Sequence, residues 1–374
     1  MVRACRVASG PYNPRMSLPA LLPLLAIAAL LSLATAGVLL ITGLAAPTLA
    51  AHVAFALGVL PLILAAMAYF VPVLTRSAGS RFAASWPPLL ASAAGLVAVL
   101  GFAGDFSPSG SGLAATLGGL AAAGLGGWTL DRTRRMLGPR HRGLDWYLAA
   151  LGCLLLALLA VLLMPLFPAQ RNALRLFHLH ANLLGFVGLA ALGTLQVLLP
   201  TCLGQADPDA ALRLRRDLKW AVAGALLIAL GSSSMLPETA AAMAPTMALL
   251  GAAAYAFVVL RMLRGWLSRF GGTLFQTHGA APSLAAAATG LFGLLALGVA
   301  HGLGWLPARP AVAGFVIAFL LPLVSGAVAH LLPVWLRPGA QGPWHAALRE
   351  RLCRWGGVRG LLLLLFGLVI TAVS

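Results

Sequence analysis

Acidic residues are scarce in this chain, and charged residues of either sign are few. Of its 374 residues, 8 are Asp or Glu and 25 are Lys or Arg, so only 9% are charged, whereas 61% are apolar. A soluble globular protein carries roughly 25% charged residues, so the composition excludes an ordinary soluble enzyme such as a Rossmann dehydrogenase. With a mean hydropathy of +0.96, we expect an all-α, polytopic membrane protein that forms a single integral membrane domain over residues 1–374.

Cysteine is also rare. The four cysteines are scattered, at Cys5, Cys153, Cys202 and Cys353. No two of them form a C-x-x-C pair, so we expect unpaired thiols without a role, and the apolar composition already excludes a zinc finger or a disulfide scaffold. The net charge of +17 would suit nucleic acid, but basic residues in so apolar a chain are typical of loops facing the cytoplasm. We therefore expect membrane lipid, and no nucleic acid, as a partner.

Eleven apolar runs are long enough, or nearly so, to cross a bilayer, which needs ~20 residues. They cover residues 17–43, 46–74, 85–104, 110–130, 144–166, 173–200, 217–235, 239–263, 283–305, 309–336 and 357–373. With the N-terminus inside, 22 of the 25 basic residues fall in inner segments and 3 in outer ones, as the positive-inside rule requires. The single Lys among 24 Arg is typical of a GC-rich bacterial genome. The sequence thus predicts a multi-pass protein of the bacterial plasma (inner) membrane with a cytoplasmic N-terminus.

An internal repeat relates the second, sixth and tenth runs. His52 precedes Pro72 by 20 residues, His180 precedes Pro200 by 20, and Pro333 ends the corresponding part of the tenth run. Such a period indicates a pseudo-symmetric array. We expect three four-helix units, at about 17–130, 144–263 and 283–373. The third unit lacks its last helix, so eleven helices are present where twelve would complete the pattern.

Histidines are the ionisable groups at membrane depth, because Asp and Glu fall only in loops or at the edges of the runs. An ionisable residue inside a span is a functional hypothesis by default. At 1.5 Å per residue, His52, His178, His180 and His301 lie within roughly 6–11 Å of the outer ends of their runs. His178 and His180 point about 200° apart. Since His52 and His180 occupy equivalent repeat positions, we expect those two to face each other.

Two neutral imidazoles in an apolar setting suit a haem iron with two axial histidines. Haem propionates need cations. The three outer basic residues, Arg171, Arg175 and Arg309, are candidates for that contact, and ordinary headgroup contacts are the alternative. For His301, a hydrogen-bonded helix contact is the alternative to a metal ligand.

The run from His178 to Pro200, HLHANLLGFVGLAALGTLQVLLP, resembles the H-x-H helix of subunit I in haem–copper oxidases, especially C-type oxidases and nitric oxide reductases. It is also similar in style to the histidine-rich helices of NnrS proteins, which bind haem and copper and are linked to nitric oxide stress. The resemblance implies a twelve-helix fold in three arcs. It also implies that His178 ligates a high-spin haem and His180 a low-spin one, with His52 as the other low-spin ligand.

Other parts of the oxidase pattern are absent. The H-x-H helix is sixth here and tenth in the oxidases, and the chain has no His-x-x-x-Tyr and no adjacent His-His. The three-histidine catalytic copper site is therefore missing. The close spacing of Gly185, Gly188 and Gly193 leaves two readings open: close helix packing, or room for a flat porphyrin.

These observations predict a b-type haem protein that transfers electrons or handles nitric oxide or another small gas. His52 and His180 would bind one haem, and an electron donor such as a quinol or a cytochrome would be its partner. His178 would serve a second haem or contact copper together with His301. The alternative function is a carrier or chaperone for haem or copper that uses the same histidine layer.

Overall fold

The computed structural model describes residues 18–77, 84–104, 109–233, 242–306 and 311–373, and all regular structure in these ranges is helical. The first four long helices are α1 (Leu18–Thr42), a second helix made of α2 (Pro47–His52), η2 (Val53–Val59) and α3 (Leu60–Thr75), then α4 (Trp86–Ala103) and α5 (Ser109–Arg135). The next four are α6 (Gly143–Leu163), a sixth helix made of η3 (Pro168–Gln170), α7 (Arg171–His180), η4 (Ala181–Gly188) and α8 (Leu189–Cys202), then α9 (Ala210–Ser233) and α10 (Ala244–Phe270).

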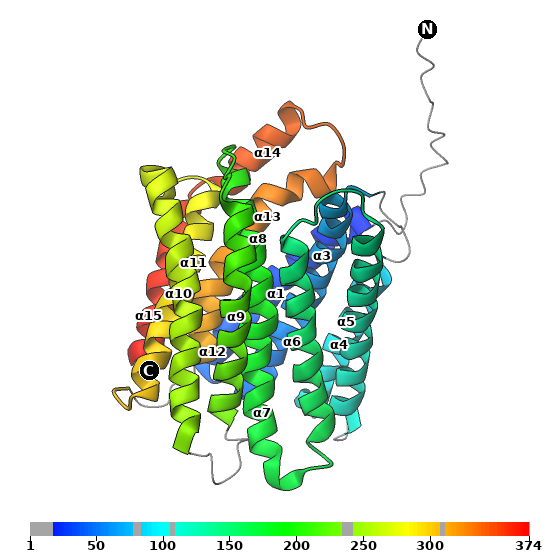
Figure 1. The fold of residues 1–374 in the computed structure, drawn as a ribbon, viewed down its shortest axis with the longest axis vertical. Helices are drawn as coiled ribbons and strands as arrows, with labels where there is room; N and C mark the ends of the chain where they lie inside the picture. The colour runs from blue at the N-terminus through cyan, green and yellow to red at the C-terminus, as the bar shows by residue number, and fades with distance from the viewer. Residues whose placement is uncertain (1–17, 78–83, 105–108, 234–241, 307–310, 374) are drawn as a thin grey trace.

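The last part of the chain adds three more long helices and one short one. They are α11 (Ala280–Gly302), a tenth helix made of α12 (Ala311–Gly314), η7 (Phe315–Leu320) and α13 (Leu321–Leu336), the short α14 (Pro343–Cys353), and α15 (Gly356–Val373). A 3₁₀ turn, η6 (Gly271–Phe275), follows α10. Figure 1 shows the long helices running roughly side by side, with α14 at one end of the bundle.

Ten helices in the described ranges are long and apolar enough to cross a membrane. The eleventh long helix, α9, falls short because charged residues fill its first turns. Each of the eleven predicted runs therefore corresponds to a long helix, and the chain is a multi-pass helical membrane protein. Exposed leucines along the outer helices, such as Leu24, Leu120 and Leu362, fit a surface that faces lipid.

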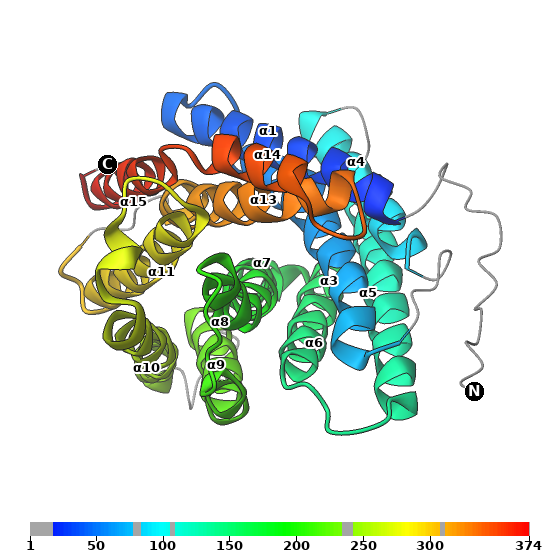
Figure 2. The same cartoon turned by 90° about the horizontal axis from the view of Figure 1, so that it is seen from above.

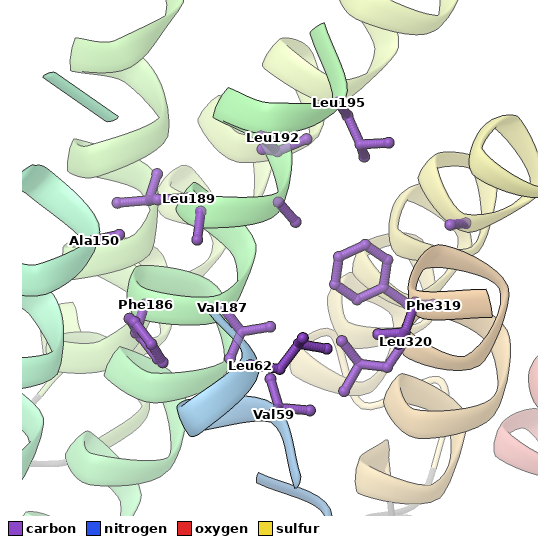
Figure 3. Packing of buried hydrophobic residues seen from close by; sticks show 14 of the residues in the cluster. Val59, Leu62, Ala150, Phe186, Val187, Leu189, Leu192, Leu195, Phe319 and Leu320 are labelled. Atoms are coloured by element: carbon purple, nitrogen blue, oxygen red, sulfur yellow. The ribbon is translucent and has the colours of Figure 1, made fainter. Parts of the chain in front are cut away.

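Three of these helices meet in the middle of the bundle. Seen from above, the α3, α8 and α13 segments lie toward the centre with the other helices around them (Figure 2). Their apolar side chains form one continuous core. In the close view, Val59 and Leu62 of the second helix, Val187 of the sixth and Leu320 of the tenth come together (Figure 3). A small cavity of about 110 Å³ lies between these three helices, lined almost entirely by apolar side chains.

The same three central helices each contain a wide π-helical turn. The three turns, η2, η4 and η7, end 13, 12 and 13 residues before Pro72, Pro200 and Pro333. A π turn bonds i to i+5 and is rare, appearing often at functional sites. In the second and sixth helices it begins within one residue of a histidine, His52 or His180.

Glycines allow neighbouring helices to pack directly on two of these turns. A Cβ at Gly95 of α4 would collide with the carbonyl oxygen of Ala56 in η2. A Cβ at Gly290 of α11 would collide in the same way with the carbonyl oxygen of Ala318 in η7. The glycines are therefore needed where a backbone approaches a backbone, a common device of membrane helices.

We predict that Gly95→Ala lowers the melting temperature of the detergent-purified protein, because the added methyl group meets a backbone carbonyl that cannot turn away. Overpacking of this kind costs about 1–3 kcal/mol. Gly101→Ala on the same helix is the matched control, because nothing lies within 4 Å of its Cβ position. Equal melting temperatures for the two variants would show that α4 does not pack on η2 as described.

Candidate functional site

His52 and His178 bring their rings together near one end of the bundle. The ring centres are 6.5 Å apart and the ring planes are 11° from parallel. His52 is the last residue of α2, and His178 lies in α7. The ring of Phe102, at the end of α4, lies 4.2 Å from that of His52. Side chains from three separate helices thus meet at this pair of half-buried imidazoles.

Backbone carbonyl groups orient the imidazoles. Nδ1 of His52 bonds to the carbonyl oxygen of Thr48 at 2.7 Å, and Nδ1 of His178 bonds to that of Ala157 at 2.9 Å. A carbonyl oxygen only accepts hydrogen bonds, so each Nδ1 carries the proton and donates it. Each Nε2 therefore keeps its lone pair, the arrangement that a metal-ligating histidine needs from its surroundings.

Asn182 adds a second restraint on His178. Its amide nitrogen Nδ2 lies 3.0 Å from the His178 carbonyl oxygen and 3.2 Å from the ring nitrogen Nδ1. Because Nδ1 already donates to Ala157, the amide proton goes to the carbonyl. The side chain of Asn182 then packs beside the imidazole and limits its rotation.

His180 was the expected partner of His52, but the structure brings His178 to His52 instead. In the described residues, the ring contacts of His52 are with Phe102 and His178. The Nδ1 of His180 donates to the Leu176 carbonyl oxygen at 2.9 Å, so its Nε2 also keeps a lone pair. By helix geometry His180 leaves α7 on the side opposite to His178.

The remaining predicted site residues lie farther toward the same end of the bundle. His301 is exposed near the end of α11 and bonds to the Leu306 carbonyl oxygen at 3.0 Å. Arg171 and Arg175 are exposed at the start of α7, and the Arg175 guanidinium bonds to the side chain of Asn172. Arg309 lies outside the described residues.

The described residues contain no group of three or more His, Cys, Asp or Glu side chains that could hold a metal ion. A metal bound by protein side chains alone, as in a structural zinc site, usually has four such ligands. An iron held in a porphyrin needs only the two axial ligands from the protein. A histidine pair therefore suits haem better than a bare metal ion.

The glycines of the sixth helix serve helix packing. A Cβ at Gly185 would lie 2.7 Å from Cβ of Cys153, and one at Gly193 would lie 2.6 Å from Cβ of Trp146. At Gly188 a Cβ would collide with the hydroxyl of Tyr255, which donates to the carbonyl oxygen of Leu184 in η4. Of the two readings of these glycines, the structure thus favours close packing over space for a porphyrin.

At the opposite end of the bundle, the structure reveals a buried carboxylate that the sequence placed at the edge of a run. Helix α9 begins at Ala210, two turns before the predicted start, so Asp217 lies inside it and its side chain is fully buried. Its Oδ1 accepts hydrogen bonds from Arg261 of α10 and from Arg216. The sequence did carry a signal for this ion pair: a basic residue inside the run that became α10, and a single acid in the neighbouring helix α9.

Asp207 anchors a second ionic cluster at this end. Its Oδ2 accepts from Arg213 at 2.6 Å and its Oδ1 from Arg269 at 2.8 Å. Burial raises the pKa of the Asp207 carboxyl, but the hydrogen bond and charge of Arg213, with help from Arg269, outweigh it and hold the pKa below its ordinary value of 3.8. These ion pairs join the loop after α8 to α9 and α10.

A scan against protein-family models finds no match for the chain, and a search of curated proteins finds no similar sequence. The functional argument therefore rests on the geometry of the site and on the sequence motifs.

We predict that acid destabilises the protein partly through Asp207. Because its folded-state pKa is lowered, its ion pairs contribute stability above the unfolded pKa, and this contribution is lost as the pH falls through the folded pKa. The melting temperature should fall as the pH drops below about 4, and Asp207→Asn should remove part of that fall. Asp131→Asn is the control, because its carboxylate is 49% exposed and pairs with Arg135 of its own helix, apart from the Asp207 cluster. An unchanged acid response in Asp207→Asn would contradict this role.

Proposed function

We propose that the protein is a b-type haem protein of the membrane that transfers electrons, with the haem iron held between His52 and His178. The observation that carries the proposal is the imidazole pair itself: ring centres 6.5 Å apart, planes 11° from parallel, and both Nδ1 atoms engaged with backbone carbonyls. Two nitrogens bonded to one metal at ~2.0–2.1 Å would place the ring centres roughly 6 Å apart when both Nε2 atoms point at the metal. The observed separation is close to that value.

The donor set also suits haem. Neutral imidazoles are common axial ligands of haem iron, and the porphyrin supplies the other four nitrogens. When bound, the iron would supply one-electron redox chemistry. Within the chain, the Thr48 and Ala157 carbonyls would hold His52 and His178 in the ligating tautomer, and Arg175 would offer a cation for a propionate.

Electron transfer fits this ligand set better than gas binding. Two axial imidazoles fill both open positions of a haem iron, leaving no free position for a gas. A reductant must then deliver one electron at a time, as a quinol or a cytochrome does. Arg171 and Arg175 give α7 an exposed, basic start beside the site.

Patterns in the sequence and the backbone support the proposed superfamily and membrane orientation. The three π turns at matching distances from Pro72, Pro200 and Pro333 favour three related units, as in haem–copper oxidase subunit I, and the H-x-H run favours that superfamily or NnrS-like proteins. The arginine-rich helix ends and loops favour a cytoplasmic N-terminus in a bacterial plasma membrane.

A second candidate function, the handling of a small apolar gas such as nitric oxide, is favoured by the cavity between the three central helices. Its volume of about 110 Å³ and its walls of side chains such as Ile63, Ala191 and Val324 suit a molecule of a few atoms. For comparison, an engineered apolar cavity of about 150 Å³ stays dry and binds benzene or xenon.

We predict that the purified protein shows a reduced-minus-oxidised spectrum of low-spin haem b, and that His52→Ala and His178→Ala each abolish it. His180→Ala is the matched control: it removes an imidazole from the same helix on the opposite side, so the spectrum should persist.

Loss of the spectrum in His180→Ala, with retention in His178→Ala, would overturn the pairing and favour His52 with His180. A colourless protein from haem-replete cells would reject haem altogether. A bound metal that dithionite does not reduce would point instead to the carrier function.

For the gas-handling candidate, we predict that Ala191→Phe slows nitric oxide consumption by the reduced protein several-fold, because the ring fills the cavity. Ala191 is buried and lines it. Ala93→Phe, at an exposed position of α4, should have no effect. Consumption that is absent, or equal in the two variants, would eliminate this candidate.

A further inference from the structure

A second hollow lies far from His52 and His178, at the arginine-rich end where α3 and α5 finish. Its volume is about 700 Å³. The residues around it combine hydroxyls, guanidinium groups and apolar surface, and they are Thr75, Arg76, Ser77, Trp128, Asp131, Arg132, Arg135, Met136 and Leu137. No part of the proposed electron-transfer function uses this hollow.

A chain of hydroxyl groups holds the Arg132 guanidinium in place. Oγ1 of Thr75, a buried side chain, donates to the Val71 carbonyl oxygen at 2.8 Å. The hydroxyl of Ser77 therefore donates to Thr75 Oγ1, which is 2.8 Å away. Ser77 in turn accepts from Nη1 of Arg132 at 3.1 Å. The face of the Trp128 ring supports the same guanidinium, 5.5 Å from the ring centre.

Two more arginines face the hollow. Arg76 ends α3 in the left-handed conformation, with φ 52°, which turns the chain sharply just before Ser77. Arg135 pairs with Asp131 at 2.8 Å, so that aspartate is already neutralised within the helix. With three arginines and one aspartate among its lining residues, the hollow carries a net charge of +2.

We propose that this hollow binds the phosphate group of an anionic phospholipid. Guanidinium groups bind phosphate oxygens through charge-assisted hydrogen bonds, and basic pockets between membrane helices on the cytoplasmic side are suited to anionic headgroups. A free phosphate ion would need only the charge. The apolar rim, including Met136 and the 91% exposed Leu137, gives the start of an acyl chain a surface to lie on, and this favours a lipid.

The test is lipid binding to the full-length protein in detergent, measured by native mass spectrometry with added phosphatidylglycerol. Arg132→Gln and Arg76→Asn remove one charge each, and Asn tolerates the left-handed conformation at position 76. Each substitution should lower the affinity for the first bound lipid molecule roughly five- to tenfold. Arg134→Gln is the matched control, since Arg134 is exposed on the same helix and does not line the hollow; its affinity should stay within about twofold.

The Ser77→Ala variant distinguishes damage to the binding site from misfolding of the whole protein. It keeps all the charges and only releases Arg132 from its hydroxyl chain, so a few-fold weakening with an unchanged melting temperature supports the proposal. Competition separates the ligand sources: inorganic phosphate and glycerol phosphate should not displace phosphatidylglycerol at equal concentration. Displacement by these ions would overturn the lipid assignment. Equal weakening by Arg134→Gln, or no weakening by Arg132→Gln and Arg76→Asn, would overturn the site.

Discussion

The structure depends on one constraint: a backbone polar group inside a membrane must find its partner within the protein, because no water is there to supply one. Long helices meet this demand along most of the chain. At one of the three π turns, η4, a neighbouring helix adds a partner: Tyr255 donates a hydrogen bond to the Leu184 carbonyl. The imidazoles of His52 and His178 obey the same rule, since each gives its Nδ1 proton to a carbonyl.

This use of Nδ1 links the fold to the proposed chemistry. A neutral histidine that donates to a backbone carbonyl with one nitrogen presents a lone pair on the other. Two such rings at 6.5 Å, from helices that are far apart in sequence, would supply both nitrogens to an iron in the proposed function. The opposite end of the bundle is organised by charge, where Asp217 and Asp207 hold arginines of neighbouring helices. The ion pairs of Asp207 and Asp217 thus lie at the end opposite to the His52–His178 pair.

Hydropathy was sufficient to predict the eleven long helices and their alternating directions, because each apolar run is long enough to stand out. It could not place helix ends where charged turns continue a helix. Helix α9 therefore begins at Ala210 and α10 extends to Phe270, beyond the predicted bounds, and Asp217 is enclosed as a result. The short helix α14 lies outside the predicted runs, since its residues are polar. Its buried His345 accepts a hydrogen bond from the Gly342 amide at its start.

The sequence predicted the histidine layer, but it did not predict which ring His52 meets. Equivalent repeat positions suggested His180. In an array of three repeat units, two neighbouring units meet through different faces, as subunits do in a head-to-tail interface. His178 and His180 lie on opposite sides of the same helix, so a contact of His52 with His178 and not with His180 agrees with that rule. Rotation of a helix about its axis depends on packing by residues such as Gly185 and Gly193 against α6, which residue spacing alone does not determine.

The most direct test of the central claim is an electron paramagnetic resonance spectrum of the oxidised, detergent-purified protein, together with its haem content. Iron between His52 and His178 with ring planes 11° from parallel predicts a rhombic low-spin ferric signal, the type given by near-parallel axial imidazoles. A high-spin ferric signal would mean that only one imidazole is bound. A protein with no haem signal at all would contradict the account of this site.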